Sequence, residues 1–177
     1  MIRLFFMRTV LTILLCAAAL FAADALRRAP GFALMDSKGQ LHDLADYRGK
    51  VVVLEFMQTT CPHCAGFAPT LQKVQQKYGD KVAILAVTDP PDTLATITQY
   101  VAGHDVTYPV LPDCGQVAYS YVRNPSLTFP HVYIVDANGM IRGDHAYGPL
   151  SLGIFEGDQL FTEIDRLLPF MAPAKKK

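Results

Sequence analysis

The chain has 177 residues, of which 16 are basic and 16 are acidic, so its formal net charge at pH 7 is zero. A charge balance this even argues against nucleic acid as a binding partner. The length fits a single globular domain once a short terminal segment is set aside.

The first 25 residues have the pattern of a secretory signal peptide. Arg3 and Arg8 precede an apolar stretch from Val10 to Phe21, and small residues with an A-x-A pattern end at Ala25. We expect cleavage after Ala25 and an extracytoplasmic location, either periplasmic or secreted. The alternative is an uncleaved anchor that would associate the protein with a membrane, although the apolar stretch is shorter than the roughly 20 residues of a spanning helix.

Residues 26–170 are predicted to form one domain in which strands and helices alternate, and residues 171–177 form a basic tail. Lys50–Phe56 is a nearly continuous apolar run, which is typical of a central strand buried on both faces. Apolar residues at helical spacing follow it, and Gly79 is expected to end that helix. Further along we expect a strand at 82–87, a helix opening at 91–92 with Leu94, Ile97, Tyr100 and Val101 on one side, an extended segment at 108–111 and a short helix at 116–121.

The last part of the domain is predicted to be a hairpin followed by a helix. Strands at 131–135 and 140–142 flank Asn138-Gly139, a pair that favours a tight hairpin turn. The terminal helix has its apolar residues at Leu160, Phe161, Ile164, Leu167 and Leu168. Together the elements predict an α/β fold, a three-layer α/β/α sandwich with a mixed central sheet.

Two cysteines lie two residues apart in Cys61-Pro-His-Cys64, between a predicted strand and a predicted helix. The first turn of a helix offers unpaired N–H groups, which favour the thiolate form of Cys61. Pro62 and His63 are expected to tune the acidity of that thiol, Pro62 by stiffening the turn and His63 as a neighbouring cation. Cys64 is expected to be more buried. This arrangement predicts Cys61 as the attacking thiolate and Cys64 as the resolving thiol.

Other uses of these cysteines stay open at this point. His63 and His131 could join the pair in a zinc or copper site, and the pair could be an inert structural disulfide. Cys114 is left over, either as a small buried residue, as a site for mixed disulfides or as a second resolving thiol.

Several segments together resemble the TlpA/ResA-type thiol–disulfide oxidoreductases, whose N-terminal segment the peroxiredoxins share. They are Pro30-Gly-Phe-Ala-Leu34, Asp36-Ser-Lys-Gly39, Leu44-Ala-Asp-Tyr-Arg-Gly-Lys50, Cys61-Pro-His-Cys64 and Phe129-Pro-His-Val-Tyr-Ile-Val-Asp136. The resemblance implies a thioredoxin-like fold with an insertion between its halves, at about 89–114. It also implies protein thiols and disulfides as substrates, an upstream redox partner, and no cofactor besides the redox-active Cys61–Cys64 disulfide.

The resemblance assigns roles to further residues. It places Pro130 at the proline that such proteins keep cis beside the cysteines, so that the Phe129 backbone can pair with a substrate strand, and Thr60 and His131 border the same site. Glu55 matches a buried acid. A carboxyl in so apolar a strand is expected to hold its proton to a high pH, which suits a group that exchanges protons with Cys64. The alternative is that Glu55 faces solvent or pairs with a cation.

Two departures leave the function partly open. Thr60 stands where the family usually has tryptophan, and Cys-Pro-His-Cys is also the motif of strongly oxidising DsbA-type proteins, so the direction of electron flow is not predicted. The competing function classes are a thiol peroxidase, for which Gln58 occupies the expected threonine position, and a metal-carrying or non-catalytic thioredoxin-like binding module.

Overall fold

The computed structural model describes residues 27–122 and 127–168. The predicted signal peptide at 1–25 and the predicted basic tail at 171–177 lie outside the described residues. Within the described part of the chain, every helix is too short or too polar to cross a bilayer.

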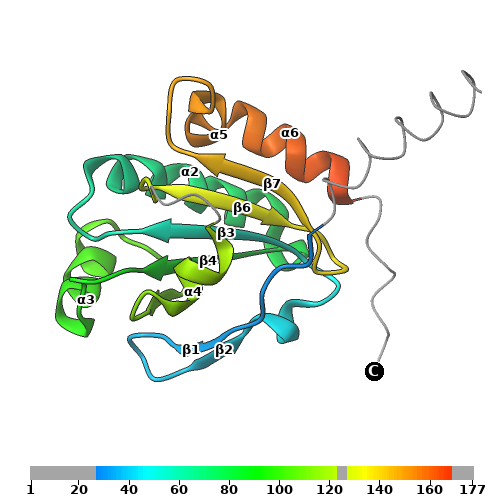
Figure 1. Cartoon of the computed structure of the whole chain (residues 1–177). Coiled ribbons are helices and arrows are strands. Elements are labelled where there is room, and N and C mark those ends of the chain that lie inside the picture. The colour runs from blue at the N-terminus through cyan, green and yellow to red at the C-terminus, as the bar shows by residue number, and fades with distance from the viewer. Residues whose placement is uncertain (1–26, 123–126, 169–177) are drawn as a thin grey trace, which may run out of the picture.

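The centre of the fold is a five-stranded mixed sheet (Figure 1). Its strands are β3 (Val51–Met57), β4 (Val82–Thr88), β5 (Val110–Pro112), β6 (His131–Val135) and β7 (Ile141–Ala146). The strand order is β5-β4-β3-β6-β7; β3, β4 and β5 are parallel, whereas β6 is antiparallel to both β3 and β7. The predicted mixed sheet is therefore confirmed, and β7 extends well beyond its predicted end at Arg142.

Helices and a small hairpin cover the two faces of this sheet. The apolar cluster on one face includes residues of α2 (Pro62–Tyr78), α3 (Leu94–Gly103), α5 (Leu152–Glu156) and α6 (Asp158–Leu167). The cluster on the other face includes residues of α4 (Gln116–Tyr121), of the 3-10 helix η1 (Leu44–Tyr47) and of the hairpin formed by β1 (Ala33–Met35) and β2 (Leu41–Asp43). A second 3-10 turn, η2 (Gly79–Lys81), joins α2 to β4. The predicted three-layer sandwich is confirmed, with a thinner layer on the α4 face (Figure 1).

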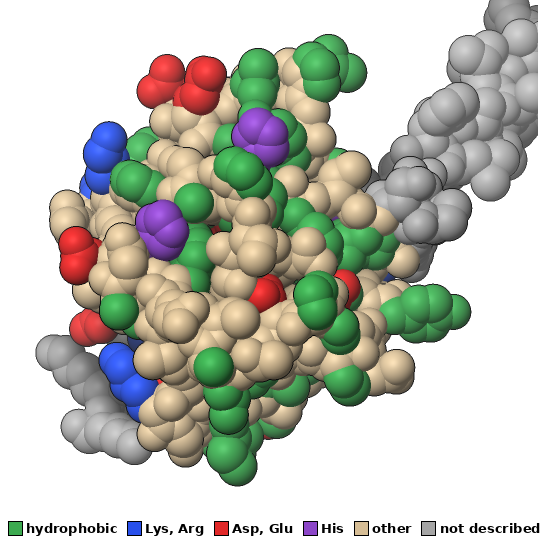
Figure 2. Space-filling model, turned by 90° about the vertical axis from the view of Figure 1, so that its left-hand side faces the viewer, with side chains coloured by type: hydrophobic (Ala, Val, Ile, Leu, Met, Phe, Trp, Pro, Cys, Tyr) green, Lys and Arg blue, Asp and Glu red, His purple; other side chains and the backbone are tan. Residues whose placement is uncertain are grey.

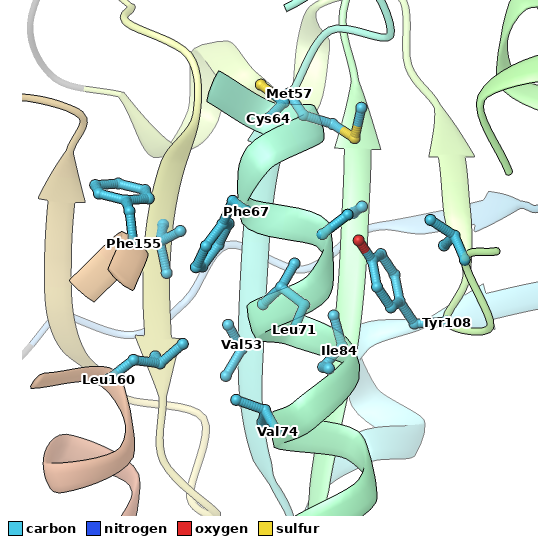
Figure 3. Packing of buried hydrophobic residues seen from close by; sticks show 14 of the residues in the cluster. Val53, Met57, Cys64, Phe67, Leu71, Val74, Ile84, Tyr108, Phe155 and Leu160 are labelled. Carbon is cyan, nitrogen blue, oxygen red and sulfur yellow. The ribbon is translucent and has the colours of Figure 1, made fainter. Parts of the chain in front are cut away.

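Strand β3 feeds both apolar clusters because successive side chains of a strand point to opposite faces. Val53 and Met57 pack towards α2, whereas Leu54 and Phe56 pack towards α4, and all of β3 is buried. Figure 3 shows the α2 side of this packing, where the predicted helix face meets the sheet. The residues of this helix face are all buried: Phe67, Leu71, Val74 and Tyr78. Burial of each such side chain stabilises the fold by roughly 1.5–3 kcal/mol.

Some local predictions were wrong. The predicted helix opening at 91–92 begins only at Leu94, because Thr93 and Thr96 form a capping box there, and Leu94 is 57% exposed instead of buried. The β1–β2 hairpin was not predicted.

In the β6–β7 turn the amide of Gly139 donates to the Asp136 carbonyl at 2.8 Å, and Gly139 supplies the left-handed φ of +74°. The predicted insertion at 89–114 contains α3 and β5.

Candidate active site

The carboxyl ends of β3, β4, β5 and β7 lie along one edge of the sheet, because β6 runs antiparallel between β3 and β7. The arrowheads of β3, β4 and β7 point to the same side in Figure 1. Figure 2 looks onto that side and shows hydrophobic side chains and two histidines spread across it, with lysine and arginine towards its left margin. Helix α2 starts at this edge, directly after the loop that leaves β3.

Cys61 occupies the N-cap position of α2 and is partly exposed. Its sulfur accepts a hydrogen bond from the amide of Cys64 at 3.4 Å, and its thiol donates to the carbonyl of Phe129 at 3.7 Å. Pro62 takes the first helical position, where a missing N–H leaves no bond unmade. The sulfur therefore lies at the positive end of the helix dipole.

The backbone opposite Cys61 belongs to the start of β6. The Phe129–Pro130 peptide bond is cis, and Pro130 is buried. Because the Phe129 carbonyl contacts the Cys61 thiol, the sulfur lies against the backbone segment that leads into β6.

Cys64 is fully buried between α2 and the sheet, and both cysteines are free thiols. Burial raises the pKa of the Cys64 thiol above its ordinary value, and the charge of Glu55 raises it further. The two sulfurs therefore differ in kind: one is accessible at a helix start, and the other is held as a buried thiol.

Glu55 is 0% exposed and points to the α2 side of the sheet, between Val53 and Met57 on β3. Neither of its carboxyl oxygens has a hydrogen-bond partner among the described residues. Burial raises the pKa of Glu55 from 4.5 to about 8. The alternative of a solvent-facing or cation-paired carboxyl is therefore not what the structure contains.

Two buried tyrosines next to this carboxyl were missed by the sequence reasoning. The hydroxyl of Tyr100 on α3 donates to the carbonyl of Cys64 at 3.2 Å. The hydroxyl of Tyr108, just before β5, is buried without a partner among the described residues. Burial, followed by the charge of Glu55, raises the pKa of both tyrosines. The sequence did carry a signal for them. A tyrosine at a position where the apolar pattern predicts burial needs a hydrogen-bond partner for its hydroxyl.

His63 is exposed on the first turn of α2 and stacks on Tyr147, with 4.2 Å between ring centroids and 23° between planes. Tyr147 in turn packs edge-on against Phe155 at 5.1 Å. Because Tyr147 follows β7, the stack ties the first turn of α2 to that strand. Fully exposed Leu150 lies in the same segment after β7.

The loop before Cys61 is fixed by the loop that follows β4. The amide of Thr59 donates to the carboxylate of Asp92 at 2.8 Å, and the Thr59 hydroxyl also donates to it. The side-chain amide of Gln58 donates to the carbonyl of Pro90 at 3.0 Å. Thr60 itself is exposed beside the cysteine.

Two of the singled-out residues lie apart from this arrangement. The His131 side chain is 7% exposed, packs on the opposite face of the sheet against Tyr133 and bonds to Asp144 at 2.7 Å. Its backbone, but not its ring, lies next to the site. Cys114 is exposed in the loop that follows β5, so the first of its three alternatives, a small buried residue, was wrong.

The metal-site alternative requires several ligands in one place. Within residues 27–122 and 127–168, no group of three or more histidine, cysteine, aspartate or glutamate side chains could hold a metal ion. His131, one of the two histidines considered, is already bonded to Asp144 on the far face of the sheet.

Comparison with known proteins finds a matching family and similar individual proteins. Residues 26–143 match the AhpC/TSA family. The thioredoxin-like protein YneN of Bacillus subtilis (strain 168) is 31% identical over 121 residues, which cover 67% of this chain and 69% of that protein. The thiol-disulfide oxidoreductase ResA of Bacillus thuringiensis subsp. konkukian (strain 97-27) is 28% identical over 65% of this chain, and this chain spans 65% of its length.

Solved structures share the fold. A protein from Chlorobium tepidum that has been proposed to be the thiol:disulfide interchange protein DsbE superposes with a TM-score of 0.71 at 25% identity, over 81% of this chain and 97% of that one. The exposed lipoprotein thioredoxin Etrx1 of Streptococcus pneumoniae strain TIGR4 superposes with a TM-score of 0.64 at 25% identity, over 78% and 100% of the two chains.

Proposed function

The chain belongs to the AhpC/TSA family, and from this premise we propose that it is a thiol–disulfide oxidoreductase that exchanges disulfides with protein partners through Cys61 and Cys64. The observation that carries the proposal is the contrast between the two sulfurs. Cys61 is partly exposed at the N-cap of α2, and Cys64 is buried one turn further on. Thiol exchange needs one accessible nucleophile and one protected resolving group, and this pair supplies both.

In the reducing direction, the Cys61 thiolate attacks a partner disulfide, forms a mixed disulfide and releases one partner thiolate. Cys64 then loses its proton to Glu55 and attacks the Cys61 sulfur. This second step forms the Cys61–Cys64 disulfide and releases the second partner thiolate, so two electrons pass to the partner. The oxidising direction is the reverse of these steps. With a pKa of about 8, Glu55 can accept and return a proton near neutral pH.

The substrate is proposed to bind along the backbone that faces Cys61. Phe129 and Pro130 border the sulfur, and an extended partner segment would pair with their backbone, while exposed Thr60 lines the other side. His131 contributes through its backbone, because its ring is buried on the far face of the sheet.

A thiol peroxidase is the weaker alternative. The Gln58 side chain stands where a peroxidase would place a threonine, and its amide is bonded to the Pro90 carbonyl. The similar curated proteins are named for thioredoxin-like or thiol-disulfide oxidoreductase activity.

We further propose that the protein works outside the cytoplasm, because residues 1–25 have the pattern of a signal peptide. There it would exchange electrons with an upstream redox partner.

The test is the reduction potential of the Cys61–Cys64 pair together with two cysteine variants. We expect Cys61→Ser to abolish the reduction of a protein disulfide such as that of insulin. We expect Cys64→Ser to accumulate a mixed disulfide, because the first step still runs and the second cannot. A potential below about −300 mV, which is typical of inert structural bridges, or full activity of Cys61→Ser would contradict the proposal.

A further inference from the structure

Three buried oxygen atoms on the α2 side of the sheet have no hydrogen-bond partner among the described residues. They are the two carboxyl oxygens of Glu55 and the hydroxyl of Tyr108. The Glu55 side chain is 0% exposed and Tyr108 is 3% exposed. Folded proteins satisfy nearly all of their buried polar groups, so a cluster of three unsatisfied atoms requires a specific explanation.

The three atoms belong to one neighbourhood. Glu55 pairs in register with Ala86, and Ala86 pairs with Val110, so these side chains form one row on the same face of the sheet. Tyr108 precedes Val110 by two residues and packs in the same apolar cluster. Figure 3 shows its hydroxyl turned towards α2. The charge of Glu55 also raises the pKa of Tyr108, second only to burial, as expected for near neighbours.

Protein groups nearby do not satisfy this cluster. The hydroxyl of Tyr100 is already used, since it donates to the carbonyl of Cys64 at 3.2 Å. Ala86 and Val110, the other members of the row, offer only apolar side chains next to Glu55.

We propose that Glu55 and Tyr108 hold one internal water molecule. A buried water typically makes about three hydrogen bonds to polar groups that would otherwise be unsatisfied, and the three oxygens provide that number. The Tyr108 hydroxyl donates to the water, and the water donates to the carboxylate of Glu55. Tyr108 is therefore a positioning residue: it acts on Glu55 through the water and does not touch the reacting sulfurs.

The consequence concerns the proton that Glu55 takes from Cys64, and so the inference rests on the proposed function. The carboxylate of Glu55 has to exist transiently in an apolar layer, and a donor from the water stabilises that charged form. Without Tyr108 the water loses the hydroxyl that donates a hydrogen bond to it, and it is bound less firmly. The carboxylate then becomes less favourable, and Glu55 releases its proton only at a higher pH.

The experiment is the titration of the Glu55 carboxyl in the full-length protein, followed by infrared absorption of the protonated group. In Tyr108→Phe we expect the midpoint to rise by about one pH unit, because a hydrogen-bonded water no longer stabilises the carboxylate. Tyr121→Phe is the matched control. Tyr121 is equally buried, but on the other face of the sheet, and its hydroxyl donates to the Pro30 carbonyl at 2.8 Å. An unchanged midpoint in Tyr108→Phe would overturn the proposal.

A high-resolution crystal structure of the parent protein gives a second, independent readout. We expect electron density for one water within hydrogen-bond distance of both Glu55 and Tyr108, and loss of that density in Tyr108→Phe. A direct bond between the carboxyl and the hydroxyl, with no water between them, would overturn the proposal. Neither readout uses turnover. If Glu55→Gln exchanged disulfides at the parent rate, only the proposed proton transfer would be rejected. If the titration midpoint of Glu55 did not move in Tyr108→Phe, only the water site would be rejected.

Discussion

At the scale of single residues, the proposed thiol exchange depends on two buried groups, Cys64 and Glu55, behind the partly exposed sulfur of Cys61. Burial raises the pKa of the Cys64 thiol, and the charge of Glu55 adds to this effect. Cys64 can therefore attack only when a neighbour removes its proton. Glu55 is suited to this because burial raises its own pKa to about 8, so that its carboxyl accepts a proton near neutral pH instead of staying ionised.

We expect Glu55→Gln to slow turnover with a protein disulfide by roughly 10²-fold, because glutamine has a similar shape but cannot accept the proton from Cys64. The effect should fall on the second step, so mixed disulfides should accumulate transiently. The rate at which iodoacetamide alkylates Cys61 is the control and should stay within a factor of two to three of the parent. Turnover of the variant at the parent rate would remove Glu55 from the mechanism.

Residue-level prediction from sequence succeeded where burial followed from a continuous pattern. Glu55 lies in a run whose every position is buried, so its environment could be predicted without a structure. Tyr108 could not be assigned, because a tyrosine at a core position looks like packing until its hydroxyl is located. The direction of the His131 ring depends on strand parity relative to β3, which the register reveals and the residue types do not.

At the scale of elements, the loop between β3 and α2 owes its conformation to a neighbour outside the motif. The carboxylate of Asp92 accepts from the amide and the hydroxyl of Thr59, and it also accepts from the hydroxyl of Thr96 at 3.2 Å. Asp92 thereby fastens the start of α3 to the loop that presents Cys61. The turn continues into the cysteine, whose amide donates to the Gln58 carbonyl at 3.0 Å.

We expect Asp92→Ala to lower the free energy of unfolding by about 1–3 kcal/mol, since the amide and hydroxyl of Thr59 lose a charged acceptor. Thiol exchange should slow as well, because the N-cap geometry of Cys61 is no longer fixed. Thr59→Val is the matched control: it removes the hydroxyl and keeps the amide bond, so its loss should be smaller in urea unfolding. Equal stability of Asp92→Ala and the parent would show that the loop needs no such anchor.

Element prediction from the sequence was accurate where a pattern had a clear end. The helix at 116–121 and the strand at 131–135 have the predicted bounds. The start of α3 was misplaced because Pro91-Asp92 resembles a helix opening, whereas Asp92 is used as a hydrogen-bond acceptor and the capping box forms at Thr93. The β1–β2 strands are short and half exposed, so they lack the alternation that identifies a strand.

At the scale of the whole molecule, the sheet topology brings the site together. Cys61 follows β3, Asp92 follows β4, and Tyr147 follows β7, and these strands end at the same edge because only β6 is reversed. The α/β class and the order of elements could be predicted from periodicity. The meeting of these three loops could not, since it depends on which strands become neighbours in the sheet.

The buried carboxyl also makes the stability of the whole fold depend on pH. Glu55 has an ordinary pKa of 4.5 and a pKa of about 8 in the folded protein. Between these values the folded chain keeps a proton that the unfolded chain has released. The contribution of Glu55 to the free energy of unfolding is therefore fully present below about pH 4.5. It is lost as the pH rises towards about 8, by up to about 1.4 kcal/mol per pH unit.

We expect the free energy of unfolding of Glu55→Gln to fall less steeply over this range than that of the parent, because glutamine has no proton to retain. The measurement is urea unfolding of both proteins under reducing conditions at several pH values between 4.5 and 8. All other titrating groups are shared, so the difference between the two slopes isolates Glu55. Parallel slopes would mean that the carboxyl is already ionised in the folded protein at neutral pH, and a base with so low a pKa would hold the Cys64 proton too weakly to relay it.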